Sequence, residues 1–437
     1  MIVSRGASTI STPRIIPRSE HPISRENISS SALKVLNQLR KAGFDACLVG
    51  GCVRDLMLGH EPKDFDVVTN ALPDQITSIF RSARVIGRRF QLVHVRFGRD
   101  VIEVATYRSL PGEDDETHTS DSGRLLRDNV FGDQEQDAIR RDITVNALYY
   151  DIRDFSVIDY VDGVKDLEAG VLRIIGDPER RFREDPVRML RVIRFAAKLG
   201  FRIEHDTAEP IRRLSVLLDE VPPARRFEEV LKLFHGGRAL ETYELLRQYD
   251  LFRYLFPMAG QMVEDGHSPY ATVLVPHALA NTDTRILDNK PVTPAFLYAV
   301  LLWGPLQQIM KRYLDRGLPP AEALRDASRE VLSAQLDCTA LPKRFSVPMR
   351  EIWTMQPRFE RRRGKMAFKL LGHERFRAAY DFLLLRVEAG EADQSLADWW
   401  TEFQQCDDQQ KQGMVKALTA EAGGAGRRRP RGRRRRQ

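Results

Sequence analysis

Cysteine is scarce in this chain, and no hydrophobic run is long. Four cysteines, Cys47, Cys52, Cys338 and Cys406, occur among 437 residues, and none of them forms a C-x-x-C pair. This spacing argues against a disulfide scaffold and a structural zinc ribbon, and it fits a reducing compartment. The longest apolar stretches, such as residues 295–303, fall far short of the roughly 20 residues of a membrane span. We therefore expect a cytoplasmic protein without a transmembrane segment.

Basic charge is concentrated at one end of the chain. The net charge is +7, and the last eleven residues, 427–437, contain eight arginines and no acidic residue. The remainder of the chain is therefore close to neutral. Such an arginine run is expected to be disordered and to bind polyanions such as the phosphates of RNA. The alternative is a solvated tail that only aids solubility.

The chain divides into an α/β segment and a helical segment. Runs of strand length lie at residues 46–49, 64–68, 92–97, 101–106, 148–151 and 157–160. A polar, acidic stretch at 109–137 reads as a long loop. From residue 178 onward the pattern is helical, beginning with Met189, Val192 and Ile193 on one face.

We therefore predict an α+β fold: a small mixed-sheet head, a long all-helical neck and body, and a disordered basic tail. The boundaries expected are a flexible lead at 1–28, the head at 29–176, the neck at 177–265, the body at 266–412 and the tail at 413–437. The lead lacks the continuous apolar core of a secretion signal, but its early arginines leave a targeting role open.

Two aspartates in one short strand are the first candidates for chemistry. In Asp64-Phe65-Asp66, residues i and i+2 of a strand point to the same face, so both carboxylates would project together. Two close carboxylates favour a bound cation, and Mg²⁺ takes carboxylate oxygens together with phosphates. A D-x-D pair alone is also common as two surface aspartates near a turn.

A double glycine precedes this strand. Leu48-Val49-Gly50-Gly51 joins a strand to a helix start, where backbone N–H groups can approach a phosphate. Arg54, in the first turn, adds a charge that can hold a triphosphate oxygen. The chain has no G-K-[ST] after these glycines and no G-x-G-x-x-G here, so neither a P-loop nor a dinucleotide fingerprint is present. A simple tight turn is the alternative.

Together these motifs carry a resemblance. The run L-V-G-G-C-V-R-D-L-M-L-G-H-E-P-K-D-F-D-V-V-T, residues 48–69, resembles the signature of the class II nucleotidyltransferases. That family contains tRNA CCA-adding enzymes and bacterial poly(A) polymerases, and the resemblance is strong over about residues 30–255. It implies that Asp64 and Asp66 bind catalytic magnesium ions. It also implies that the neck selects the nucleotide and binds RNA.

A third acid is expected in two-metal phosphoryl chemistry, and two residues qualify. Asp142 lies in R-R-D-I-T-V-N-A-L, residues 140–148, which resembles another family motif. The resemblance implies a catalytic role for Asp142 and a phosphate contact for the neighbouring Arg141. Glu103 alternates with apolar residues in V-I-E-V-A-T, so it should lie on the exposed sheet face. Its alternative role is a structural salt bridge, for example to Arg108.

A short motif at the start of the neck is the candidate for base recognition. Asp185 and Arg188, in R-E-D-P-V-R, lie three residues apart and can meet on one helical face. A carboxylate can accept from the adenine amino group, and an arginine can donate to a ring acceptor. From the residues alone, the favoured role of Asp185 is an N-cap with Pro186 at the first helical position. The family resemblance favours base reading.

Three features favour polyadenylation over CCA addition. V-I-G-R-R-F-Q-L-V-H-V, residues 85–95, resembles the bacterial poly(A) polymerases, as do the arginine-rich tail and the segment at about 344–400. The resemblance implies template-independent transfer of AMP from ATP to RNA 3′ ends, with two Mg²⁺ ions and release of pyrophosphate. Messenger and small RNAs, and RNA-decay proteins, are the partners it implies. A CCA-adding enzyme and a non-catalytic RNA-binding module are the alternatives.

Overall fold

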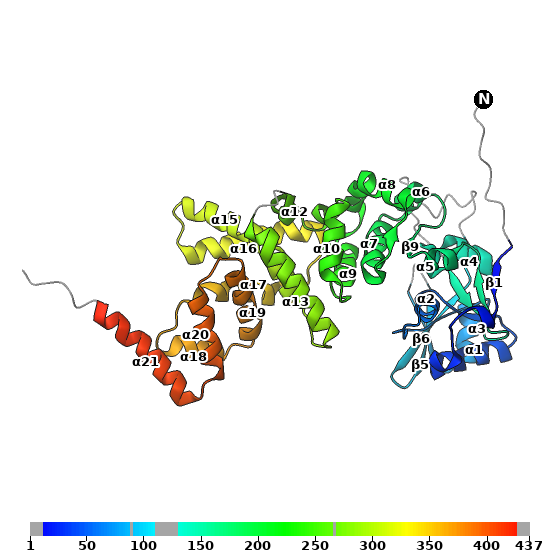
Figure 1. Ribbon diagram of the computed structural model, residues 1–437, viewed down its shortest axis with the longest axis horizontal. Coiled ribbons are helices and arrows are strands. Elements are labelled where there is room, and N and C mark those ends of the chain that lie inside the picture. The colour runs from blue at the N-terminus through cyan, green and yellow to red at the C-terminus, as the bar shows by residue number, and fades with distance from the viewer. Residues whose placement is uncertain (1–11, 88–90, 110–129, 265–267, 426–437) are drawn as a thin grey trace, which may run out of the picture. The chain divides into compact units, whose positions relative to one another are not determined.

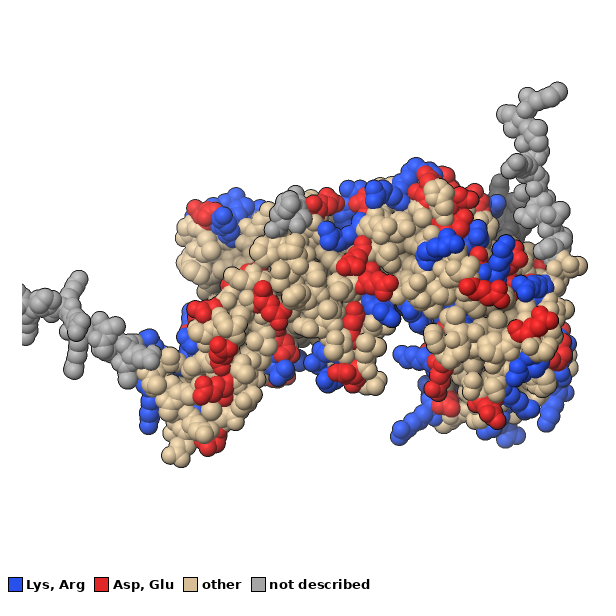
Figure 2. Space-filling view, viewed as in Figure 1, with Lys and Arg blue, Asp and Glu red and all other residues tan. Residues whose placement is uncertain are grey.

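The chain forms two compact units that divide between residues 218 and 219. The computed structural model describes residues 12–87, 91–109, 130–264 and 268–425, with side chains described as far as residue 418 (Figure 1). On the face shown in Figure 2, basic and acidic side chains are interspersed over each unit. This agrees with a folded body whose net charge is near zero.

The first unit is built on a mixed eight-stranded sheet. Its order is β1-β8-β7-β2-β3-β6-β5-β4, and β3 pairs with β6 in parallel whereas the other pairs are antiparallel. The strands span β1 Arg14–Ile16, β2 Ala46–Val49, β3 Asp66–Thr69, β4 Ala83–Ile86, β5 Leu92–Phe97, β6 Asp100–Thr106, β7 Leu148–Tyr150 and β8 Val157–Asp159. This architecture confirms the predicted α+β class.

Helices with local capping signals accompany the sheet. They are α1 Ser30–Lys41, α2 Gly51–Met57, α3 Pro73–Ile79, α4 Gln134–Arg140 and α5 Gly163–Glu168. Ser29 accepts a hydrogen bond from the N–H of Ala32 at 3.2 Å and so caps α1, as its position before the apolar pattern predicts. Leu36 and Leu39 of α1 are fully buried. The apolar helix face therefore packs into the core of the unit.

Two expectations at the edges of the head are wrong, and one strand was missed. Residues 12–28 are not a flexible lead, because β1 pairs with β8 and buries Ile16. Only three residues form β1, which is too short for a periodic pattern to reveal. The loop expected at 109–137 ends earlier, since α4 begins at Gln134 with Asp133 as its N-cap. The expected loop residues 110–129 lie outside the described part of the chain. The strand β4 was not predicted.

The first unit continues past the predicted head boundary at residue 176. It includes α6 Pro178–Glu184, α7 Val187–Leu199 and α8 His205–Leu214, and a small parallel pair of β9 Val171–Leu172 with β10 Arg202–Ile203. The predicted apolar face of α7 is buried, and Gly200 ends the helix in a left-handed conformation. Therefore the segment that carries the base-reading motif belongs to the same compact unit as the sheet.

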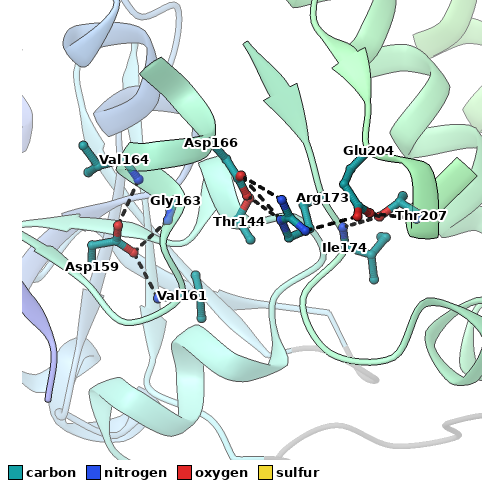
Figure 3. Close-up of polar contacts among 10 residues, drawn as sticks. All are labelled: Thr144, Asp159, Val161, Gly163, Val164, Asp166, Arg173, Ile174, Glu204 and Thr207. Atoms are coloured by element: carbon teal, nitrogen blue, oxygen red, sulfur yellow. Dashed lines mark hydrogen bonds and ion pairs between the residues drawn. The ribbon is translucent and has the colours of Figure 1, made fainter. Parts of the chain in front are cut away.

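Polar side chains fasten the loop after α4 to this helical segment (Figure 3). Thr144 donates its hydroxyl to Asp166 at 2.7 Å, and Asp166 pairs with Arg173 at 3.1 Å. Arg173 also pairs with Glu204 at 3.2 Å. Thr207, which donates to Glu204, accepts from the backbone N–H of Ile174. These contacts hold the backbone at Thr144 against residues 173–174.

All the regular elements that the structure describes in the second unit are helices. Its α-helices are α9 Pro223–Phe234, α10 Ala239–Gln248, α11 Phe252–Leu255, α12 Pro257–Glu264, α13 Val275–Leu287, α14 Pro294–Leu301, α15 Trp303–Asp315, α16 Pro320–Cys338, α17 Lys343–Phe359, α18 Lys365–Leu371, α19 Phe376–Glu388, α20 Gln394–Gln405 and α21 Asp408–Ala425. Aromatic residues such as Phe359, Trp400 and Phe403 form its C-terminal core. None of the helices described is both long and apolar enough to cross a membrane.

The predicted start of the disordered tail at residue 413 is wrong. Helix α21 runs from Asp408 to Ala425, so the first thirteen residues assigned to the tail are helical. Val415 is buried against the core that contains Trp400, which explains why the helix continues. The arginine run at 427–437 lies outside the described residues.

Candidate active site

The centre of the site is a group of carboxylates on β3 and β6. Asp66 begins β3 and lies directly opposite Glu103 in the parallel pairing. Burial raises the pKa of Asp66 to about 6, and the negative charges of Glu103 and Asp64 add to this effect. Asp64 precedes the strand rather than lying in it, but its charge still acts on Asp66. The carboxylates of Asp64 and Glu103 are therefore close enough for their charges to act on Asp66.

Glu103 also has a structural contact. It lies opposite His94 on β5, and the two side chains approach to 3.3 Å. The salt bridge suggested from the sequence was to Arg108, whose Nη2 donates instead to the carbonyl of Gln91 at 2.7 Å. About half of the Glu103 side chain remains exposed. It can therefore contact His94 and still face the group around Asp66.

The double glycine forms the expected turn between β2 and α2. Gly50 has a φ of +79° and is the residue before the first turn of α2. A Cβ at this position would lie 3.6 Å from Nη1 of Arg141. Glycine is therefore needed here for its backbone conformation, and its lack of a side chain leaves the approach to Arg141 open.

Arg141 is held in place by two partners. Its guanidinium donates to Asp137 at 2.8 and 3.0 Å and to the Tyr149 hydroxyl at 3.1 Å. Asp137 is buried and also accepts from Tyr149 at 2.8 Å. The positive charge of Arg141 lowers the pKa of Asp66, partly opposing the effect of burial. Arg141 thus lies near both the glycine turn and the carboxylates, where a phosphate would be bound.

Arg54 is buried rather than directed into open solvent. Its side chain pairs with Asp55 at 2.6 Å and donates to the side-chain oxygen of Asn146. Asn146 lies in the loop after α4, so Arg54 joins the glycine-turn helix to that loop. A phosphate contact by Arg54 was predicted from the sequence. In the described part of the chain Arg54 contacts Asp55 and Asn146, and the phosphate contact stays a prediction.

Asp142 has a different environment from Asp66. Its carboxylate pairs with Arg191 and approaches Nε of Arg188 to 3.7 Å. Burial raises the pKa of Asp142, but the two arginines outweigh burial, and the pKa lies below its ordinary value. Asp142 is therefore held as an anion by α7. Glu103, rather than Asp142, lies opposite Asp66 in the sheet.

The predicted base-reading pair lies at the junction of α6 and α7. The expected N-cap position of Asp185 is wrong by one residue, because Asp185 follows α6 and Pro186 is the residue before α7. The carboxylate of Asp185 still accepts from the N–H of Val187 at 3.2 Å, where α7 begins. Arg188 is buried and donates to Glu184 at 2.9 Å and to the carbonyl of Arg181 at 2.8 Å. Glu184 and Asp142 therefore fix the position of Arg188.

Several residues of this site were not predicted. They are Asp137, Asn146, Tyr149, Arg181, Glu184, Arg191 and Phe195. The spacing of Asp137 four residues before Arg141 was a signal, because such pairs meet on one helical face. No sequence signal indicated Phe195. In the structure, the guanidiniums of Arg54 and Arg194 lie 5.4 and 4.7 Å from the centre of its ring.

The carboxylates around Asp66 are the candidate ligands for a metal ion. Among the described residues, no group of three His, Cys, Asp or Glu side chains is arranged to hold an ion. Mg²⁺, however, binds through one or two carboxylates together with substrate phosphates. The raised pKa of Asp66 beside two further negative charges is the feature that a cation would relieve. The residues therefore fit a divalent ion that binds with a phosphate.

Comparison with protein families matches three segments of the chain. Residues 46–173 match the poly A polymerase head domain, and residues 200–262 match a probable RNA and SrmB- binding site of polymerase A. Residues 316–436 match the polymerase A arginine-rich C-terminus. The predicted G-R-R-F stretch, whose residues 88–90 lie outside the described part of the chain, falls within the first of these matches.

Individual relatives differ in how much of this chain they match. Poly(A) polymerase I of Escherichia coli O6:H1 is 50% identical over 428 residues, covering 96% of this chain and 92% of that protein. The CCA-adding enzyme of Ligilactobacillus salivarius is 35% identical over 233 residues, which cover 53% of this chain and 56% of that enzyme.

Among solved structures, the Bacillus stearothermophilus CCA-adding enzyme in complex with CTP has a TM-score of 0.58. It shares 26% sequence identity, with 85% of this chain and 80% of that chain covered. The nucleotidyltransferase fold is thus common to both groups, whereas sequence identity along almost the full length is with the polyadenylating enzyme. The chain belongs to the bacterial poly(A) polymerase family of nucleotidyltransferases, and poly(A) polymerase is its enzyme class.

Proposed function

We propose that this enzyme transfers AMP from ATP to the 3′ hydroxyl of RNA, repeatedly and without a template, with release of pyrophosphate. The observation that carries this proposal is the pairing of Asp66 with Glu103 beside Asp64, a glycine turn and Arg141. This arrangement combines a cation-favouring group of carboxylates with a nearby guanidinium that can bind a phosphate.

Magnesium is the cofactor proposed, as two ions. Asp64 and Asp66 would hold the metal, and Glu103 is favoured over Asp142 as a third carboxylate because Asp142 is paired with Arg191. When bound, Mg²⁺ would lower the pKa of the attacking hydroxyl and neutralise charge on the leaving pyrophosphate. Asp66 would keep its negative charge above about pH 6, its pKa in the folded protein.

Arg141 and the glycine turn would bind the triphosphate. The Arg141 guanidinium is oriented by Asp137 and Tyr149, so it loses little freedom when it contacts a phosphate oxygen. The backbone N–H of Gly51 at the start of α2 favours negative charge, whereas the N–H of Gly50 donates to the carbonyl of Leu148 at 3.2 Å and so shapes the turn. Arg54 would act with them by fixing Asn146 and the loop beside the phosphates.

Asp185 and Arg188 would select adenine. Arg188 is held rigidly by Glu184, so its remaining donors have a defined direction. Asp185 accepts a hydrogen bond from the N–H of Val187, and a carboxylate can accept several hydrogen bonds at once. RNA 3′ ends of messenger and small RNAs are the proposed acceptors, which would place the enzyme in RNA processing and decay.

Primer extension tests this proposal. Purified enzyme with Mg²⁺ and a labelled A-ended RNA would be incubated with each NTP separately, and in parallel with a tRNA that lacks its terminal nucleotides. A long ladder with ATP alone is expected. Addition of CTP to the tRNA followed by a single A would instead identify CCA addition. RNA binding without incorporation would identify a non-catalytic module.

A further inference from the structure

The second unit contains a groove that has no role in the proposed chemistry. Its volume is about 620 Å³, within the range of roughly 300–1,000 Å³ typical of small-molecule sites. Residues from α13, α14, α17 and α19 line it, together with His235 at the end of α9. All of these residues belong to the second unit, whereas the carboxylate site belongs to the first.

Two guanidiniums in the groove are not neutralised by ion pairs. The acidic side chains that line it are paired: Asp288 with Lys290, Asp381 with Arg377, Glu374 with Arg375 and Glu388 with His277. Within the described residues, no carboxylate lies at ion-pair distance from Arg285 or Arg344, although burial raises the pKa of the Asp381 carboxyl and the charge of Arg285 acts across the groove to lower it. Arg285 donates to the carbonyl of Pro291 at 3.1 Å, and Arg344 lies over Phe345. Both cations are therefore positioned for an anionic ligand.

A buried hydrogen-bond acceptor also lines the groove. Nδ1 of His235 lies 3.1 Å from the carbonyl of Leu231, which accepts its proton and leaves Nε2 as the acceptor nitrogen. Nε2 is buried and has no partner among the described residues. Burial lowers the pKa of His235, so the ring stays neutral. Because buried polar atoms are normally paired, this nitrogen indicates a missing donor.

Aromatic and aliphatic side chains supply the remaining wall. Phe296 and Phe345 are both half-buried and line the groove with Leu384. Exposed aromatic faces of this kind are suited to stacking with a planar ring. The groove thus combines an anion-binding pair, a hydrogen-bond acceptor and aromatic surface, three features that a nucleotide satisfies at once.

We propose that this groove binds a nucleotide, with its phosphate at Arg285 and Arg344, and its base against the aromatic wall. An amino or hydroxyl group of the ligand donates to Nε2 of His235. The nucleotide is either free or one unit of a bound RNA strand. The proposal does not depend on the chemistry assigned to Asp64 and Asp66.

Photo-crosslinking to the full-length enzyme tests the location. One sample receives 8-azido-AMP and a second receives an oligo(A) RNA that carries one 8-azidoadenosine, and the crosslinked peptides are mapped by mass spectrometry. Adducts within residues 278–297 or 344–352 are expected. Labelling by the free nucleotide indicates a mononucleotide site, and labelling by the RNA alone indicates a strand contact. Adducts confined to the first unit in both samples would overturn the proposal.

Matched variants test the contacts. Arg344→Glu should weaken nucleotide-dependent crosslinking in the groove roughly tenfold, the size expected for one charge-assisted phosphate contact. Arg350→Glu, an exposed position on the same helix that does not line the groove, should leave it unchanged. His235→Gln, which keeps an acceptor, should retain more binding than His235→Phe. Circular dichroism confirms folding of each variant.

Equal labelling of all four variants would exclude the groove as a nucleotide site. Polyadenylation on short primers separates this result from failure of the proposed function, because the groove variants keep the complete carboxylate site. Normal turnover together with unchanged crosslinking would leave the enzyme assignment intact and refute only the groove. A groove that binds a protein segment instead would also give no specific adduct, and so would contradict the proposal.

Discussion

At the scale of single residues, the electrostatics of Asp66 lead to a test of stability. Its pKa is raised to about 6 in the folded protein, from an ordinary value of 3.8. The folded state therefore holds this proton more tightly than the unfolded state, so stability falls as pH rises between these values. Above about pH 6, where Asp66 is ionised in the folded and the unfolded state, its charge lowers the stability of the folded protein by the full amount.

We expect Asp66→Asn to raise the melting temperature at pH 8 without divalent ions, and to have little effect near pH 3.5. The same variant should abolish nucleotide addition, since a neutral amide cannot replace the carboxylate. Thermal unfolding followed by circular dichroism at both pH values, with primer extension, measures these effects. A variant that melts below wild type at pH 8, or retains substantial transfer, would contradict this assignment.

The third carboxylate can be identified by comparing Glu103→Gln with Asp142→Asn. Glu103 faces Asp66, so its loss should lower kcat by at least about 100-fold and increase the Mg²⁺ concentration needed. Asp142 is paired with Arg191 in a half-buried position, so its loss should chiefly destabilise the protein, by about 1–3 kcal/mol, as the loss of a partner of a charged hydrogen bond does. Urea unfolding and a Mg²⁺ titration of the rate distinguish the two. The reverse pattern would identify Asp142.

Residue-level motifs could be predicted because each lies in one short stretch of sequence. Gly50, Gly51, Asp64 and Asp66 all fall within residues 48–69, and the structure places them at neighbouring strand ends. The partners of Asp142 could not be predicted, because Arg191 is 49 positions away along the chain. Such pairing depends on how α7 packs against the loop, which local periodicity does not contain.

At the scale of secondary-structure elements, the turn between β2 and α2 can be tested with paired glycine variants. Gly50 and Gly59 both have positive φ angles, +79° and +73°. An alanine at either position loses stability through backbone strain, and more so at Gly50, whose ψ of −134° takes it outside the left-handed helical region. Only Gly50 lies beside Arg141; nothing lies within 4 Å of a Cβ on Gly59.

Gly50→Ala should therefore raise the KM for ATP, whereas Gly59→Ala should lose stability without this change in KM. Steady-state kinetics and chemical denaturation of both variants provide the measurement. An equal rise in KM for the two variants would mean that strain alone, and not the approach to Arg141, determines the effect.

The junction between α6 and α7 raises a second question at this scale. Asp185 makes a capping contact with the N–H of Val187, and it is also the proposed reader of adenine. Asparagine caps a helix as well as aspartate does, but its amide cannot accept from the base in the same way at both atoms. Asp185→Asn should therefore keep stability within about 0.5 kcal/mol of wild type.

The same variant should lose preference for ATP over GTP and CTP, and Asp185→Ala should lose both preference and about 1 kcal/mol of stability. Competition between the four NTPs in primer extension measures the preference. If Asp185→Asn keeps full selectivity for ATP, the residue acts only as a cap.

At the scale of the whole molecule, most of the helical architecture follows from patterning, but its limits do not. The apolar face of α7 is visible in the sequence and is buried as predicted. The end of α21 is not visible, because its burial depends on Val415 meeting a core built from residues 355–403. Likewise β1 depends on β8, which is more than one hundred residues away along the chain.

Binding of RNA by the C-terminal arginines makes a prediction for the complete chain. Removing residues 426–437 deletes eight arginines while leaving the described folded units intact. Each phosphate contact to single-stranded RNA contributes about 0.7 to the slope of log K against log salt concentration. The truncated enzyme should bind RNA more weakly and with a visibly shallower salt dependence.

Fluorescence anisotropy with a labelled oligo(A) RNA at several salt concentrations measures this slope. The kcat at saturating RNA should be unchanged, because the active site lies in the first unit. An unaltered salt dependence would show that the arginines serve only as a solubilising tail.

The parallel pairing of β3 with β6 also has a consequence for folding. We expect residues 66 and 103 to pair late in folding, because α3, β4 and β5 lie between β3 and β6 along the chain, and this pairing brings two like charges together. Loop closure of this length is slow compared with hairpin formation. Divalent cations should therefore accelerate the last refolding phase of the wild-type enzyme, and have no such effect on Asp66→Asn. The carboxylates proposed for catalysis would in this way also slow folding, and the proposed divalent cofactor would lower that barrier.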